Sequence, residues 1–141
     1  MQTKSQPKIV LDAWALLALI FGEEPAAKTV KEIFERKGPK SSVNISWINL
    51  GEVYYTIARR KGQQTAEEVL NDIKLLPISF HEPLKADVLA AAKIKSKYQL
   101  SYADAFAVSL TKKINGTIFT GDPEIIVLQN NIKVRKLSRA V

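Results

Sequence analysis

Four acidic residues stand out because each lies alone in an otherwise uncharged stretch of the sequence. These acids are Asp12, Glu52, Asp104 and Asp122. The uncharged stretches around them are residues 9–22, 46–58, 100–111 and 114–123. Segments this apolar are expected to be mostly buried, where a lone carboxylate is costly unless something compensates its charge. No lysine or arginine lies in these stretches, so hydrogen bonds at a helix start or a metal ion remain as compensators.

Four such carboxylates indicate a particular chemistry if the fold brings them together. Converged carboxylates repel one another and need a hard divalent cation that prefers oxygen ligands, such as Mg²⁺ or Mn²⁺. Ions held in this way clamp an in-line displacement at phosphorus and activate the attacking water. A nuclease adds lysines and arginines outside the site, which attract the nucleic-acid backbone. The acids therefore favour metal-dependent hydrolysis of phosphodiesters.

Each acid also has a purely structural interpretation. Asp12 and Asp122 lie between an expected strand and an expected helix, which is the position of a helix N-cap. Asp104 comes three residues after Ser101, as in a capping box with aspartate in place of glutamate. Glu52 fits a structural role least well because it lies inside a helix, although a solvated position on the outer face stays open. Taken singly, the acids leave both interpretations open.

Alternating strands and helices are expected to position the acids. The expected strands are residues 8–11, 42–45, 77–80, 117–120 and 132–136. The expected helices, marked by prolines, N-cap residues and glycines at their ends, are residues 13–21, 25–38, 47–61, 65–75, 83–98, 101–114 and 123–129. This order predicts an α/β fold with a central, mainly parallel sheet and helices on both faces. Ligands bind beyond the carboxyl ends of such strands, which is where the four acids are expected to meet.

Composition narrows the class of protein. The chain has 141 residues and is 46% hydrophobic, so we expect one domain with its own core, after a flexible lead at residues 1–7. The absence of cysteine excludes disulfides and thiol catalysis, and a single histidine, His81, excludes a multi-histidine metal site. The longest apolar stretch, residues 9–21, is too short for a bilayer and contains Asp12, so we expect a soluble, cytoplasmic protein.

An excess of basic residues favours a polyanionic partner. Lysine and arginine number 21 against 14 acids, a formal net charge of +7. Arg59, Arg60 and Lys61 end one expected helix, and Lys112 and Lys113 end another. Such charges favour the helix dipole and lie away from a site at the opposite helix ends, so we do not assign them to the reaction centre.

The sequence resembles the PIN-domain ribonucleases, most closely the VapC-like toxins of toxin–antitoxin pairs, over residues 9 to about 134. Four segments in order carry the resemblance: IVLDAWALLALI, SWINLGEVYY, SYADAFAVSL and IFTGDPEI. The resemblance implies a PIN-like three-layer fold, Mg²⁺ or Mn²⁺ as cofactor, endonucleolytic RNA cleavage, a VapB-like antitoxin partner and a homodimer. It also implies the site residues. Asp12, Glu52 and Asp104 match the metal ligands, Asp122 matches the fourth acid, and Thr120 matches a supporting hydroxyl.

The chain departs from the family's pattern at the residue directly after Asp12. The family often has Ser or Thr directly after the first aspartate, whereas Ala13 stands here, so we omit that position from the site.

The sequence leaves two other functions open. One rival is a non-catalytic nucleic-acid-binding module whose acids are caps and solvated side chains. The other is a Mg²⁺-binding, phospho-acceptor receiver-like domain, which would carry adjacent acids after the first strand. A homodimer face on the first helix, at Trp14, Leu17 and Phe21, competes with simple core packing.

Overall fold

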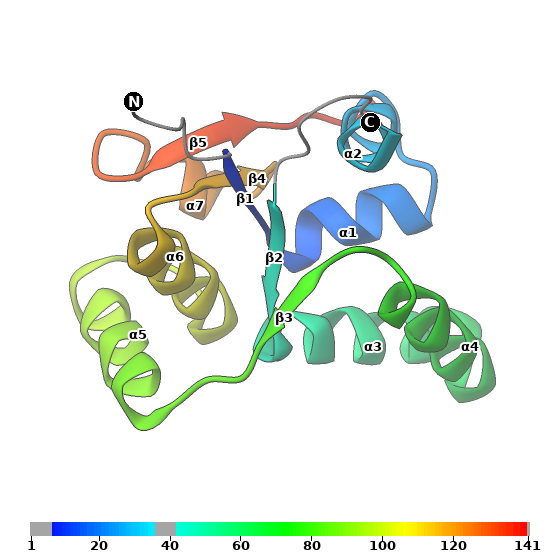
Figure 1. Cartoon of the computed structure of the whole chain (residues 1–141), viewed down its shortest axis with the longest axis horizontal. Helices are drawn as coiled ribbons and strands as arrows, with labels where there is room; N and C mark the ends of the chain where they lie inside the picture. The colour runs from blue at the N-terminus through cyan, green and yellow to red at the C-terminus, as the bar shows by residue number, and fades with distance from the viewer. Residues whose placement is uncertain (1–6, 36–41, 141) are drawn as a thin grey trace, which may run out of the picture.

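The fold is a parallel sheet with helices on both faces (Figure 1). The computed structural model describes residues 7–35 and 42–140. The strands are β1 (Lys8–Leu11), β2 (Ser42–Ser46), β3 (Ser79–His81), β4 (Thr117–Thr120) and β5 (Lys133–Lys136). The helices are α1 (Ala13–Ile20), α2 (Ala26–Glu35), α3 (Trp47–Lys61), α4 (Gln63–Lys74), α5 (Lys85–Lys97), α6 (Tyr102–Ile114) and α7 (Pro123–Ile126). The predicted three-layer α/β fold is confirmed.

The order of the strands creates a boundary at the centre of the sheet. The strands lie in the order β3-β2-β1-β4-β5, and every neighbouring pair is parallel. The chain therefore starts at the centre, moves outward to β3 and then returns to place β4 beside β1. Such a reversal of direction is a topological switch point, and ligands of open parallel sheets bind at its carboxyl end.

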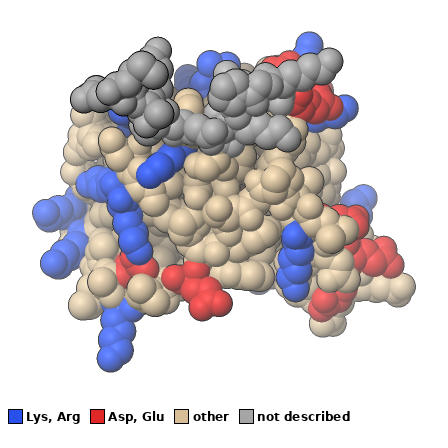
Figure 2. Space-filling view, viewed as in Figure 1, with Lys and Arg blue, Asp and Glu red and all other residues tan. Residues whose placement is uncertain are grey.

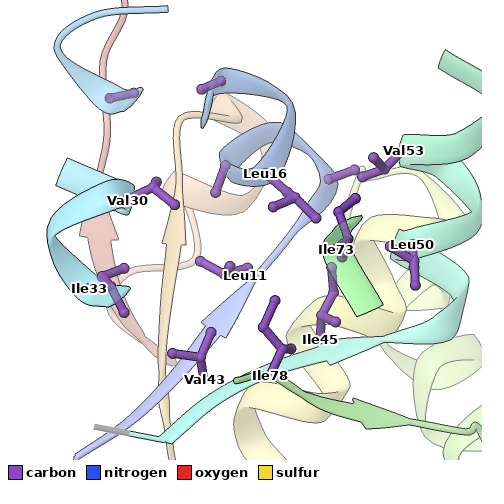
Figure 3. Packing of buried hydrophobic residues seen from close by; sticks show 14 of the residues in the cluster. Leu11, Leu16, Val30, Ile33, Val43, Ile45, Leu50, Val53, Ile73 and Ile78 are labelled. Carbon is purple, nitrogen blue, oxygen red and sulfur yellow. The ribbon is translucent and has the colours of Figure 1, made fainter. Parts of the chain in front are cut away.

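Strand β1 divides the hydrophobic core into two parts because successive side chains point to opposite faces of a sheet. Ile9 and Leu11 pack in a cluster with residues of α1 to α4. Figure 3 shows this cluster, in which Leu11 lies near Leu16 of α1 and Val30 of α2. Val10 belongs to a second cluster with residues of α5, α6, β4 and α7. Burial on both faces explains why the central strand is apolar without alternation.

Most predicted boundaries lie within two residues of the observed ones, and the differences at two helices have local causes. The helix predicted from residue 65 begins at Gln63, because Gly62, with φ 93°, ends α3 and directly precedes α4. The predicted start at Thr65 is therefore wrong. The helix predicted over residues 123–129 is a single turn, Pro123–Ile126. The helix end predicted at Gly38 and nearly all of the lead predicted at residues 1–7 lie outside the described residues.

Helix length bears on the question of membrane insertion. Within the two described ranges, no helix has both the length and the apolar character needed to cross a membrane. Helix α1, which occupies the most apolar stretch of the sequence, has 8 residues.

The sequence predicts that residues 1–141 form a single domain, and this stays a prediction.

Candidate active site

Asp12 and Thr120 form the centre of the candidate site, at the switch point between β1 and β4. Asp12 is 1% exposed and caps α1, since its Oδ1 accepts a hydrogen bond from the Ala15 N–H at 2.9 Å. Its Oδ2 accepts a hydrogen bond from the hydroxyl of Thr120, the last residue of β4. The Thr120 oxygen accepts in turn from the Asp122 N–H at 2.9 Å. Thr120 therefore links the first acid to the loop that carries the fourth.

Asp122 and Asp104 lie at the starts of two further helices. Asp122 caps α7, because its Oδ1 accepts from the Glu124 N–H at 2.9 Å. Asp104 lies in the first turn of α6, where the Ser101 hydroxyl oxygen accepts from the Asp104 N–H at 3.1 Å. The Asp104 side chain is nearly buried. The predicted caps at Asp12 and Asp122 are confirmed. Each cap uses the Oδ1 atom of the carboxylate.

Glu52 approaches the site from α3. The Ser46 hydroxyl caps this helix by accepting from the Ile48 N–H at 3.2 Å. The Asn49 side chain donates to the Ala103 carbonyl at 3.0 Å and so ties α3 to the first turn of α6. Glu52 lies one turn further along and is partly buried, and its Oε1 has no hydrogen-bond partner among the described residues. A fully solvated Glu52, which the sequence left open, is not what the structure shows.

The carboxylates act on one another electrostatically. Burial raises the pKa of Asp12 to about 7; the hydrogen bonds from Thr120 and Ala15 oppose this rise, and the charges of Asp122 and Glu52 add to it. Burial, a hydrogen bond with Asp122 and the charge of Asp122 raise the pKa of Asp104 to about 8. Burial and the charge of Asp122 also raise the pKa of Glu52. The fold therefore brings all four acids into one electrostatic field.

This set of side chains fits a hard divalent cation in its chemistry. Its donors are oxygen atoms, and none of the four acids forms an ion pair with a described lysine, arginine or histidine. The Oε1 of Glu52 and the Oδ1 of Asn49 are buried without a hydrogen-bond partner within the described part of the chain. No three acidic or histidine side chains of residues 7–35 and 42–140 already surround one point as ligands.

A close contact with α1 holds the loop between β4 and α7. A Cβ atom added at Gly121 would overlap the indole ring of Trp14. The guanidinium carbon of Arg139 lies 5.2 Å from the centroid of the same ring. Trp14, Leu17 and Phe21 are all partly buried against the core. Core packing therefore accounts for part of the surface of these three residues, and a dimer face on this helix stays a prediction.

Basic residues lie at the C-terminal ends of the helices that carry Glu52 and Asp104. Arg59, Arg60 and Lys61 lie in the last turn of α3, and Lys112 and Lys113 lie in the last turn of α6, as predicted. The last two lysines line a groove of about 600 Å³ between α5 and α6. Figure 2 shows lysine and arginine side chains projecting on the left, over the side of the molecule where α5 and α6 lie. These charges are placed to attract a polyanion toward the molecule.

Three residues that position the site were not singled out from the sequence: Ser46, Asn49 and Gly121. Asn49 is a polar residue with 0% exposure one turn before the lone acid of α3, and its place in an uncharged stretch was the available signal. Gly121 separates the hydroxyl of Thr120 from the carboxylate of Asp122, which marks a close approach. Its partner, Trp14, lies more than one hundred residues away in sequence, so only the fold reveals the contact.

The fold and the positions of the acids define a class: a parallel α/β domain with acidic side chains at its topological switch point. The family described as the PIN domain matches residues 9–130, and the chain belongs to this family. The resemblance inferred from the sequence motifs is thereby confirmed. No curated protein sequence matches the chain.

Solved structures share the fold at low sequence identity. VapC20 of Mycobacterium tuberculosis, a sarcin–ricin loop cleaving toxin, is 20% identical with a TM-score of 0.71, and the match covers 85% of this chain and 94% of that one. A chain of VapBC2 from Rickettsia felis, bound to a promoter DNA fragment, is 13% identical with a TM-score of 0.69, covering 92% and 98%. PAE2754 of Pyrobaculum aerophilum is 17% identical with a TM-score of 0.66, covering 91% and 89%.

Proposed function

We propose that the protein is a metal-dependent endoribonuclease that cleaves RNA phosphodiester bonds. The observation that carries the proposal is the position of four acids at the switch point of a PIN-domain sheet: Thr120 links Asp12 to the Asp122 loop, and Asn49 ties the helix of Glu52 to the first turn of α6, where Asp104 lies. Helix capping accounts for Asp12 and Asp122 but not for Glu52, which lies inside α3 and has no basic partner among the described residues. A structurally similar protein, VapC20, is a toxin that cleaves the sarcin–ricin loop.

The side chains divide the work of the proposed reaction. Asp12, Glu52 and Asp104 would hold Mg²⁺ or Mn²⁺, and Asp122 would help to hold a second ion or orient the attacking water. The Thr120 hydroxyl fixes the rotamer of Asp12 by donating to its Oδ2. When bound, the ion supplies charge stabilisation at the phosphate and a lowered pKa of water. The basic surface attracts the RNA backbone from outside.

We further propose that this enzyme is the toxin of a toxin–antitoxin pair, acting in the cytoplasm on RNA. PIN-domain membership supports this proposal, and several structures with the same fold are toxin–antitoxin complexes, including one from Klebsiella pneumoniae at 15% identity. The partner is then a VapB-like antitoxin, and the protein itself forms a homodimer. Co-expression with its cognate antitoxin should relieve growth arrest caused by the protein alone, with no relief from an unrelated antitoxin.

Cleavage of a labelled RNA in the presence of Mg²⁺ or Mn²⁺ tests the nuclease proposal. The wild-type protein should release discrete fragments, and EDTA should abolish them. Asp104→Asn, which keeps the shape of the side chain, should lower the rate by orders of magnitude. Undiminished cleavage in excess chelator would overturn the metal mechanism. RNA binding without cleavage under any metal condition would favour the non-catalytic binding module instead.

A further inference from the structure

Three side chains on the outer face of α3, Ile48, Tyr55 and Arg59, form a stripe on the same face as Glu52 and have no role in the proposed metal chemistry. Ile48, Glu52, Tyr55 and Arg59 follow one another at spacings of three or four residues, so they lie on one face of the helix. Tyr55 is 48% exposed and Ile48 is 36% exposed, whereas neighbouring apolar side chains of the helix are buried. The stripe therefore places a large aromatic ring in solvent next to an acid of the reaction centre.

Arg59 gives this ring a positive neighbour. Its guanidinium carbon lies 5.0 Å from the centroid of the Tyr55 ring, within the range of a cation–π contact. Tyr55 is three residues after Glu52, which places it about 4.5 Å further along the helix axis. The aromatic ring thus lies about one helical turn from the Glu52 carboxylate, and Arg59 begins about two turns away and reaches back to the ring.

We infer that Tyr55, backed by Arg59, is a stacking platform for an unpaired RNA base next to the phosphate at the acidic edge. This inference rests on the proposed ribonuclease function and adds a residue outside the acidic cluster that contacts the substrate. Unpaired bases stack on exposed aromatic rings, and an arginine beside the ring adds a cation–π or phosphate contact. A base within a duplex has no free face for Tyr55, so the platform selects loops and single strands.

The adjacent arginine provides a matched control for the cation. Arg60 has the same charge and lies in the same helical turn, but its guanidinium carbon lies 4.9 Å from the centroid of the Phe21 ring. A general attraction of RNA to the end of α3 depends equally on both arginines. A platform depends on Arg59 much more than on Arg60.

Binding of a fluorescein-labelled, mixed-sequence 12-nucleotide RNA tests the inference by fluorescence anisotropy. The variants are made in the full-length Asp104→Asn protein and measured in EDTA, so that no cleavage occurs. Tyr55→Phe keeps the ring and should bind within about twofold of its parent. Tyr55→Leu keeps an apolar side chain without a ring and should bind about tenfold more weakly. Arg59→Gln should weaken binding several-fold more than Arg60→Gln does.

Further measurements on the same variants distinguish loss of base stacking from changes in folding or oligomeric state. Light scattering and circular dichroism should show unchanged oligomeric state and folding for all variants, since Tyr55 is half exposed. A 2-aminopurine base in the RNA should lose fluorescence on binding the parent and much less on binding Tyr55→Leu. Equal affinity of the Tyr55→Phe and Tyr55→Leu variants overturns the platform while RNA cleavage by the wild type still supports the proposed function. A Tyr55→Leu protein that changes from dimer to monomer makes the stripe a subunit interface and overturns the platform. Absence of both RNA binding and cleavage overturns the platform together with the proposed function.

Discussion

Individual carboxylates in this molecule serve the fold and the candidate site with different oxygen atoms. Asp12 caps α1 through Oδ1 and accepts from Thr120 through Oδ2, so its position is fixed before any ion binds. Each carboxylate oxygen has two lone pairs, which leaves capacity for a cation beside these hydrogen bonds. Structural caps and metal ligands are therefore not alternatives at this residue. Capping at Asp12 and Asp122 therefore does not exclude metal binding by the same residues, which stays a prediction.

Replacing Asp104 by asparagine separates a cation-binding cluster from four structural acids. Asp104→Asn removes one charge from the cluster and should leave the metal-free protein as stable or more stable, with a Tm raised by a few degrees at pH 8. Mg²⁺ should raise the Tm of the wild type more than that of the variant, because a ligand stabilises only the state that binds it. Thermal melts of both proteins with EDTA and with Mg²⁺ check this. A destabilised variant and a wild type indifferent to Mg²⁺ would reverse the conclusion.

Removing the hydroxyl that links the first and fourth acids should affect both stability and pH dependence. Thr120→Val keeps the shape of the buried side chain but leaves the Asp122 N–H without its acceptor, at a cost of about 1–3 kcal/mol. The Thr120 hydrogen bond lowers the pKa of Asp12, so its loss should raise that pKa further. The acidic limb of the rate–pH profile should therefore move to higher pH. Thr120→Ser should restore the wild-type profile, and an unchanged profile in Thr120→Val would argue against the link.

At the scale of elements, the strands and helices were predictable because their signals are local. Apolar β-branched runs marked β1 and β4, and Ser101 marked the start of α6. The sequence also predicted that Asp12 and Asp122 lie at one edge, since carboxyl ends of parallel strands share it. The pairing of β1 with β4 and the contact between Trp14 and the β4–α7 loop were not predictable. Both depend on residues about one hundred positions apart, for which no local pattern exists.

The packing of α1 against the β4–α7 loop gives a prediction at the same scale. Gly121→Ala forces its new methyl group against the Trp14 ring and should cost about 1–3 kcal/mol, while displacing the loop that carries Asp122. Gly51→Ala is the matched control, because a Cβ atom at Gly51 meets nothing within 4 Å, and alanine favours a helix interior. Denaturant unfolding should show a lower midpoint for the first variant and an equal or higher midpoint for the second. Equal midpoints for the two variants would contradict the close contact.

At the scale of the whole molecule, an acidic edge lies within a basic surface. The formal net charge is +7, although the candidate site itself holds four acids. The affinity of Asp104→Asn for single-stranded RNA in EDTA should therefore fall steeply with salt, since each phosphate contact releases counterions. With three or more such contacts, the Kd should rise about 20-fold or more between 50 and 200 mM salt. Salt titrations by anisotropy measure this slope, and a Kd independent of salt would exclude electrostatic capture.

The raised pKa values of the acidic cluster predict how the stability of the whole protein depends on pH. Asp12 titrates near 3.8 when unfolded and near 7 when folded, so between these values the native state binds more protons than the unfolded state. The stability linked to this group is complete below about pH 4 and is lost as pH rises through about 7. Asp104, with a folded pKa of about 8, extends the loss to higher pH. In EDTA, the Tm of the wild type should therefore fall relative to that of Asp104→Asn as pH rises from 5 to 8.

Mg²⁺ should change the Tm of the wild type in the opposite direction, because metal ligands must be deprotonated and Mg²⁺ binding strengthens with pH. Parallel melts in EDTA and in Mg²⁺ across this range measure both trends. A constant Tm difference between the two proteins in EDTA would show that Asp104 does not hold a proton in the folded state and would remove the electrostatic basis of the proposed cation site.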